Sequence, residues 1–219
     1  MLKRIFLIIL SFILSFIFAI TSIRDASAYV PVIDPGHGGE DGGAVSPGGD
    51  VESEINLDIS MKMKYLFCLF GISPVMIRET DISIHSPKAN SLREKKVSDL
   101  KNRVSLINSV EEAFLISIHQ NTFTDSRYSG AHIFYNGEQS RDFAVLLQKR
   151  IRDHIDPSNT REAKKVPKGV YLMEHVKCPA ILAECGFMTN LRELELLRNP
   201  SYRVKLALLI VSTYLILEY

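Results

Sequence analysis

The sequence predicts an α/β fold in a single domain, with a twisted, mostly parallel or mixed β-sheet and helices on both faces. Three observations predict it. Short apolar runs alternate along the chain with segments of helical period. The run at 114–118 is apolar except for Ser117, as in a strand that is covered on both faces. The length of 219 residues, 46% of them hydrophobic, favours one domain with a sizeable core and excludes a disordered chain.

Residues 1–28 have the features of an export signal, because Lys3 and Arg4 precede a run at 5–20 that is apolar except for two serines. This run is long for a cleaved signal and short of the roughly 20 residues that span a bilayer, while Ala26-Ser27-Ala28 favours cleavage. We therefore predict a signal peptide or N-terminal membrane anchor at 1–28 and an exported domain at 29–219, which meets the membrane only through this leader.

Charge and cysteine content exclude two further classes of protein. The 26 Lys and Arg against 25 Asp and Glu give a net charge of +1, which lacks the basic excess of a nucleic-acid-binding protein. Cys178 and Cys185 lie in one apolar run that is expected to be a strand, where seven residues span roughly 23 Å. That separation is far beyond disulfide reach, and Cys68 is expected to be a small apolar residue of the core.

The expected elements alternate between strand and helix. A strand at 29–34 is ended by Pro35-Gly36, and apolar residues recur every three or four positions across 52–70, which predicts a helix that Gly71 ends. A strand at 72–77 follows. We expect further helices at 97–107, 138–154 and 202–217, further strands at 114–118, 131–135 and 179–185, and a polar loop at 79–91. The last helix contains Lys205 and is short, so a buried helix is favoured over a membrane span.

Four polar residues are expected at the carboxyl edge of the sheet, where ligands of open α/β sheets gather. His37 follows the first strand in a glycine-rich turn, His119 ends an apolar strand, and Glu184 lies near the end of the last strand. Glu52 starts the first helix and can turn back over the same edge. Three such ligands, an open position for water and one carboxylate left over as base would make a zinc hydrolase.

Each residue can also be explained without a metal. A histidine between glycines is often a turn residue, one at a strand end is often a core residue, and Glu52 is favoured at a helix start by the dipole. Glu184 is harder to explain, because a carboxylate in an apolar strand is costly to bury without a partner. Glu54 competes with Glu52, but lies about 200° away around the helix, off the face of Ile55 and Ile59. The remaining histidines are expected to be structural or solvated: His85, His132, His154 and His175.

The segments around these residues occur in a distinctive order. They are Val32-Ile33-Asp34-Pro35-Gly36-His37-Gly38-Gly39, then Glu52, then Ser117-Ile118-His119-Gln120-Asn121, Ser129-Gly130-Ala131 and Pro179-Ala180-Ile181-Leu182-Ala183-Glu184-Cys185-Gly186-Phe187. Through them, and over nearly all of residues 30–217, the chain resembles the zinc-dependent N-acetylmuramoyl-L-alanine amidases. Within that family, segments 93–108, 159–163 and 169–173 resemble the germination-specific, spore-cortex branch.

The resemblance implies a mechanism and residue roles. One Zn²⁺ would be bound by His37, Glu52 and His119, and Glu184 would be the catalytic carboxylate. The reaction would be hydrolysis of the amide between N-acetylmuramic acid and the L-alanine of the peptidoglycan stem peptide. Three residues are expected to contact substrate: Arg78 and Arg103, whose guanidinium groups suit the carboxylates of the stem peptide, and Asn121. Cys185 and Gln120 depart from the aliphatic or smaller apolar residues expected beside the site.

The narrower resemblance implies a biological setting. The protein would act outside the cytoplasm, in a sporulating bacterium in the forespore intermembrane space, during cortex maturation with formation of muramic-δ-lactam. An accessory protein and a deacetylase that acts on the product are the expected partners besides peptidoglycan. Two alternatives are a zinc-free, inactive peptidoglycan-binding relative and a zinc carboxypeptidase. The second is disfavoured because its histidine and glutamate ligands are usually three residues apart, whereas His37 and Glu52 are fifteen apart.

Overall fold

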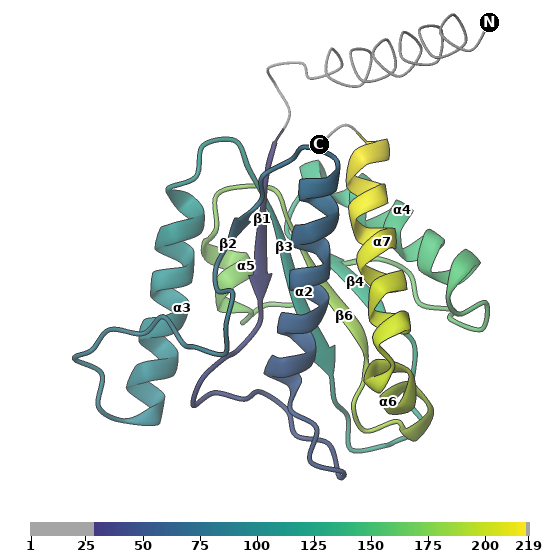
Figure 1. Ribbon diagram of the computed structural model, residues 1–219, viewed down its shortest axis with the longest axis horizontal. Helices are drawn as coiled ribbons and strands as arrows, with labels where there is room; N and C mark the ends of the chain where they lie inside the picture. Colours follow the sequence, from purple (N-terminus) through teal and green to yellow (C-terminus); the bar gives the residue numbers. More distant parts are fainter. Residues whose placement is uncertain (1–28, 218–219) are drawn as a thin grey trace, which may run out of the picture.

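A computed structural model describes residues 29–217 (Figure 1). The leader predicted at 1–28, and with it the choice between cleaved signal and anchor, lies outside the described residues. The described chain forms the following elements in order: β1 (Val30–Pro35), α2 (Glu52–Leu69), β2 (Val75–Met76), α3 (Leu92–Asn108), β3 (Ala113–Asn121), β4 (His132–Tyr135), α4 (Glu138–His154), β5 (Lys164–Lys165), α5 (Tyr171–His175), β6 (Ala180–Phe187), α6 (Leu191–Arg198) and α7 (Pro200–Ile216).

The strands form one mixed sheet in the order β2-β1-β3-β6-β4-β5. Strands β2, β1, β3 and β6 run parallel to one another, whereas β4 is antiparallel to β6 and parallel to β5. Helices α2, α4 and α7 cover one face, and α3 and α5 cover the other (Figure 1). The predicted α/β architecture with helices on both faces of a mixed sheet is therefore confirmed.

The two central strands are buried on both faces. In β3, Ile116 and Ile118 face the core under α2 and α7, while Leu115 packs in the second core under α3 and α5. Helix cover on both sides removes the polar face that an exposed strand would have, which explains why the run is apolar apart from Ser117, whose hydroxyl donates to the buried Asp34. Because β1, β3 and β6 are parallel, their carboxyl ends lie at one edge of the sheet.

The closing apolar segment is a helix of the core. Helix α7 packs against α2, where the ring of Tyr214 meets that of Phe67 edge to face at 5.1 Å between centroids. Within the described residues, no helix has the length and apolar character needed to cross a membrane. The preference for a buried helix at 202–217 is thus confirmed.

The sequence patterns misplaced several peripheral elements. The strand expected at 72–77 shrinks to Val75–Met76, because Pro74 precedes it and only two residues pair with β1. Helices α5 and α6 and the two-residue strand β5 were not expected at all. Each is too short to show a clear apolar period in the sequence. The remaining local signal for α6 is its N-cap, where the Asn190 side chain accepts a hydrogen bond from the Glu193 amide. All three cysteines are free thiols, but Cys68 is exposed near the end of α2, so the expectation that it lies in the core is wrong.

Candidate metal centre

The three predicted ligands lie together at the carboxyl edge of the sheet. His37 lies in the loop after β1, Glu52 is the first residue of α2, and His119 lies in β3. One ligand atom from each lies within 4.8 Å of the other two. His37 Nε2 is 3.4 Å from one Glu52 oxygen, and His119 Nδ1 is 3.0 Å from the other. Two imidazole nitrogens and a carboxylate at this spacing suit a zinc ion that keeps an open position for water.

Glu52 is fixed in this position by backbone donors. Its Oε2 accepts a hydrogen bond from the Ala44 amide at 2.9 Å, and its Oε1 accepts one from the Gln120 amide at 3.0 Å. Burial alone would raise the pKa of Glu52, but the neighbouring imidazoles of His119 and His37 hold it well below its usual range. Glu52 is therefore anionic and suited to bind a cation, while Glu54 is exposed on the outer side of the helix.

The side chain of Gln120 completes this arrangement. Its Nε2 donates to Asn56 Oδ1 at 3.0 Å, and the Asn56 amide in turn donates to Gly36 O and to Glu52 Oε1, both at 3.3 Å. The departure of Gln120 from the expected smaller residue thus places a polar side chain behind the Glu52 carboxylate, on the side of α2.

His37 is oriented by a carboxylate that the sequence analysis did not single out. Its Nδ1 lies 3.0 Å from Asp41 Oδ2, which leaves Nε2 facing Glu52. Lys96 Nζ pairs with the same Asp41 oxygen at 3.2 Å. Burial would lower the pKa of His37, yet Asp41 and Glu52 raise it to about 9. A carboxylate bonded to the far nitrogen of a ligand histidine is the usual support of a metal site, and the spacing from His37 to Asp41 within a glycine-rich loop was its only sequence signal.

The loop that carries His37 is held from beneath by two arginines. Arg78 donates to Pro35 O and Gly36 O, both at 2.9 Å, and Arg103 donates to Pro35 O at 3.0 Å and to His37 O at 2.7 Å. Both side chains are only 2% exposed. The expectation that they bind stem-peptide carboxylates does not fit this geometry, because their donors are occupied by backbone carbonyls and by buried acids. Asn121 ends β3, and its contact with substrate stays a prediction.

Glu184 is the carboxyl group next to this cluster. It lies opposite His119 in the register of the parallel strands β3 and β6. The residue is partly buried, and its Oε2 is enclosed and makes no hydrogen bond with the described residues. Burial raises its pKa. A carboxyl group whose pKa is raised beside metal ligands is well suited to accept and return a proton near neutral pH.

A cavity of about 290 Å³ connects these groups to the face covered by α3 and α5. His37, His119 and Glu184 lie on its wall, together with apolar side chains such as Leu100 and Leu172 and several further charged groups. The carboxyl group of Glu184 and the two histidines therefore share one partly apolar space, in which electrostatic interactions are stronger than in bulk water.

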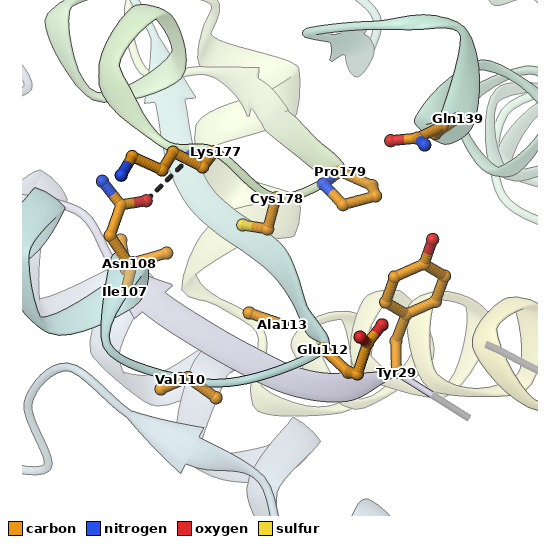
Figure 2. A pocket seen from close by; sticks show the side chains of 10 residues that line it. All are labelled: Tyr29, Ile107, Asn108, Val110, Glu112, Ala113, Gln139, Lys177, Cys178 and Pro179. Carbon is orange, nitrogen blue, oxygen red and sulfur yellow. Dashed lines mark hydrogen bonds between the residues drawn. The ribbon is translucent and has the colours of Figure 1, made fainter. Parts of the chain in front are cut away.

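A second cavity of similar size lies at the opposite edge of the sheet (Figure 2). It lies where β3 begins and where the chain enters β6, between Glu112 and Lys177. Figure 2 shows the thiol of Cys178 pointing into it, and burial raises the pKa of that thiol. None of the predicted site residues lines this cavity, so it is separate from the metal centre.

Comparison with known proteins shows which chains this one is similar to. A family model described as N-acetylmuramoyl-L-alanine amidase matches residues 32–213. The germination-specific N-acetylmuramoyl-L-alanine amidase of Bacillus subtilis is 36% identical over 183 residues, which cover 83% of this chain and 76% of that protein. The CwlD amidase of Clostridioides difficile, solved in complex with the GerS lipoprotein, is 32% identical with a TM-score of 0.81 and covers 86% of this chain and 99% of its own. The amidase AmiC2 of Nostoc punctiforme is 25% identical with a TM-score of 0.73, covering 86% and 96%.

Replacing Gly36 by alanine should remove the metal site. A Cβ at this position would lie 2.3 Å from Cε1 and Nε2 of His119, so the imidazole would have to leave its place beside Glu52. Two remaining ligands hold an ion poorly, and we expect Gly36→Ala to bind little zinc in a competition titration with a chelator. Gly137→Ala is the control, because no atom lies within 4 Å of its added Cβ. Wild-type zinc affinity in Gly36→Ala would contradict this geometry.

Asp41→Asn should weaken zinc binding while it leaves the ligands themselves in place. The neutral amide is a poorer acceptor for His37 Nδ1, and loss of such support typically lowers metal affinity by about 10- to 100-fold. The matched control is Glu40→Gln, which removes a neighbouring exposed carboxylate that pairs with Lys95 and not with a histidine. Equal zinc affinities for the two variants would show that Asp41 does not orient His37.

Proposed function

The chain belongs to the N-acetylmuramoyl-L-alanine amidase family, and we propose that one zinc ion, bound by His37, Glu52 and His119, serves its reaction. That reaction is hydrolysis of the amide between N-acetylmuramic acid and the L-alanine of peptidoglycan. The observation that carries the zinc proposal is the meeting of three candidate ligand atoms within 4.8 Å of one another, beside a carboxyl group whose enclosed Oε2 makes no hydrogen bond with the described residues.

When bound, zinc would polarise the scissile carbonyl and make a water molecule more acidic. Glu184 accepts a proton from the attacking water, whose oxygen bonds to the carbonyl carbon of the lactyl group. The carbon–nitrogen bond then breaks, and Glu184 returns the proton to the departing amine of L-alanine. The products are a free lactyl carboxylate on the sugar and a stem peptide with a free amino terminus.

The remaining residues of the site position these groups. Asp41 orients His37, and the amides of Ala44 and Gln120 orient Glu52. Because the carboxylate, both histidines and Glu184 are all present, the alternative of an inactive binding protein has no support in the site. A carboxypeptidase is disfavoured because the family match covers residues 32–213 with an amidase.

The two glutamates should differ in what their replacement removes. Glu184→Gln should retain the fold and most of the zinc but lose at least about 10²-fold in rate, since a positioned acid or base contributes at least that much. Glu52→Gln should instead lose zinc affinity, with activity partly restored by excess zinc. Zinc content, melting temperature and rate of amide hydrolysis measured on both variants test this difference. A zinc-loaded, active Glu184→Gln protein would defeat the mechanism.

The proposed biological role is maturation of the spore cortex. The similarity to the germination-specific amidase of Bacillus subtilis and to the CwlD amidase supports it. On this proposal the leader at 1–28 exports the domain at 29–219, which acts outside the cytoplasm in the forespore intermembrane space. A lipoprotein is the accessory partner that the CwlD complex suggests for this chain too. A deacetylase would act on the peptide-free muramic acid, so that the freed amine and the lactyl carboxylate can close to the lactam.

Deletion of the gene should leave vegetative growth normal and yield spores whose cortex lacks muramic-δ-lactam, because the peptide must leave before the lactam closes. Digested cortex analysed by mass spectrometry measures this. Complementation with the wild-type chain should restore the lactam, whereas Glu184→Gln should not. Normal lactam in deletion spores would contradict the role in the cortex and would favour a role in general turnover of the cell wall.

A further inference from the structure

Two aromatic rings lie side by side on the surface of the loop between β3 and β4. The centroids of the Phe123 and Tyr128 rings are 4.4 Å apart, and the two residues remain 48% and 46% exposed. Single exposed apolar residues are ordinary, but two exposed aromatic rings in contact form a contiguous apolar surface, which is a candidate binding surface.

The backbone of this loop is tied down on both sides of the pair. The Phe123 amide donates to Thr189 Oγ1 at 3.2 Å, and the side-chain amide of Asn190 donates to Ser126 O at 2.9 Å. At the far end of the loop, the Gly130 amide donates to the buried carboxylate of Glu193 at 2.8 Å. The loop is thus anchored to the turn and helix that follow β6.

The underside of the pair is also supported. The ring of Tyr128 rests near that of Phe187, with centroids 6.4 Å apart, and the Arg161 guanidinium lies 4.9 Å from the centre of the Phe187 ring. Arg161 Nε donates to Ser129 O at 2.9 Å. Phe187 itself is 3% exposed, so the exposed ring of Tyr128 is supported by a buried aromatic ring. A ligand that stacks on rings already held in place loses little conformational entropy.

The pair lies on the same edge of the sheet as the metal centre. Phe123 follows His119 by four residues, which limits the chain between them to about 14 Å. Phe187 follows Glu184 by three residues and pairs with Asn121 across β3 and β6. The aromatic surface therefore continues directly from the two strands that carry a metal ligand and the catalytic carboxyl.

We propose that Phe123 and Tyr128 form a stacking subsite for a sugar ring of the glycan strand, adjacent to the muramic acid from which the peptide is removed. This inference rests on the proposed amidase function. The substrate is a polymer, so sugars continue on either side of the reacting residue. The face of a pyranose ring presents C–H groups, which are attracted to the negative face of an aromatic ring. The Tyr128 hydroxyl adds a donor and acceptor for sugar hydroxyl or N-acetyl groups.

The surroundings of the pair favour a sugar over a protein partner. The intervening loop is polar, with Asp125 and Arg127 paired to each other and serines at 126 and 129. Two half-exposed rings offer far less than the roughly 800 Å² that each partner contributes to a standard protein interface. A small aromatic surface surrounded by polar residues matches the apolar face of one sugar ring.

The binding test uses peptide-free oligosaccharides of β-1,4-linked N-acetylglucosamine and titration calorimetry. The double variant Phe123→Leu with Tyr128→Leu keeps apolar volume but removes the aromatic faces, and should bind at least about tenfold more weakly than the wild type. The exchange Phe123→Tyr with Tyr128→Phe keeps both faces and should retain affinity. Tyr65→Leu is the matched control, because Tyr65 is 63% exposed but lies thirteen residues along α2 from Glu52, roughly 20 Å away.

The kinetic test compares two substrates, glycan strands that carry stem peptides and a muramic acid monosaccharide that carries the same peptide. In the double leucine variant, the ratio of kcat/KM for strands to kcat/KM for the monosaccharide should fall about tenfold, with an unchanged melting temperature. An unchanged ratio, or wild-type oligosaccharide affinity in that variant, would overturn the proposal. So would loss of lipoprotein binding by the variant with glycan binding intact, which would make the pair a protein interface.

The two proposals fail in different ways. A wild-type protein that hydrolyses neither substrate refutes the amidase function, and the calorimetric comparison still decides the subsite because it requires no hydrolysis. A wild-type protein that hydrolyses both substrates but binds no oligosaccharide refutes the subsite alone.

Discussion

The buried ion pair between Asp34 and Arg103 is the interaction on which the site depends. Arg103 Nη1 lies 2.5 Å from Asp34 Oδ1, both residues are almost fully enclosed, and the second Asp34 oxygen accepts a hydrogen bond from Ser117 Oγ at 2.7 Å. Burial alone would raise the pKa of Asp34, but Arg103 holds it below its usual range. A buried pair is stable only when its remaining polar atoms are bonded. Here the remaining donors of Arg103 bind Asp99 and the carbonyls of Pro35 and His37. The hydrogen bonds that stabilise the ion pair therefore also hold the loop that carries His37.

The glycines of this loop follow from the same close packing. Gly36 touches the His119 ring, and Gly43, with φ +72°, lies where a Cβ would be 2.6 Å from both Glu52 Oε2 and His37 Cδ2. His37 itself adopts φ +60°, a conformation that is uncommon for a residue with a side chain. The loop tolerates this conformation because the carbonyl of His37 and those of the two preceding residues are bonded to buried guanidinium groups. The hydrogen bonds that make the loop rigid thus also maintain the strained backbone of His37.

Helix α3 links this loop to the cavity beside His119 and Glu184. Lys95 and Lys96, near the start of the helix, pair with Glu40 and Asp41 of the loop. Arg103, two turns further along the same helix, supports the loop from beneath, and Leu100 between them lines the cavity. A displacement of α3 would therefore move His37, because the helix contacts both Asp41 and the His37 carbonyl. The position of His37 and the wall of the cavity thus both depend on the packing of a single helix.

Local patterns were enough to predict the alternation of strands and helices, the apolar character of the central strands, and the position of His37, His119 and Glu184 towards the carboxyl ends of strands. These features depend on local periodicity and on the rule that parallel strands end at one edge. The choice of Glu52 over Glu54 also followed from the sequence, because the direction of a side chain around a helix depends on its position in the helix alone. The roles of Arg78 and Arg103 required the assembled fold, since 66 residues separate Arg103 from His37 in the chain and nothing local specifies which carbonyls a guanidinium meets. The same holds for Asp41, whose partner is four residues away but whose effect depends on which nitrogen of His37 faces Glu52. The aromatic pair at 123 and 128 likewise became visible only when packing showed which apolar side chains the core leaves exposed, because burial is a property of the assembled fold.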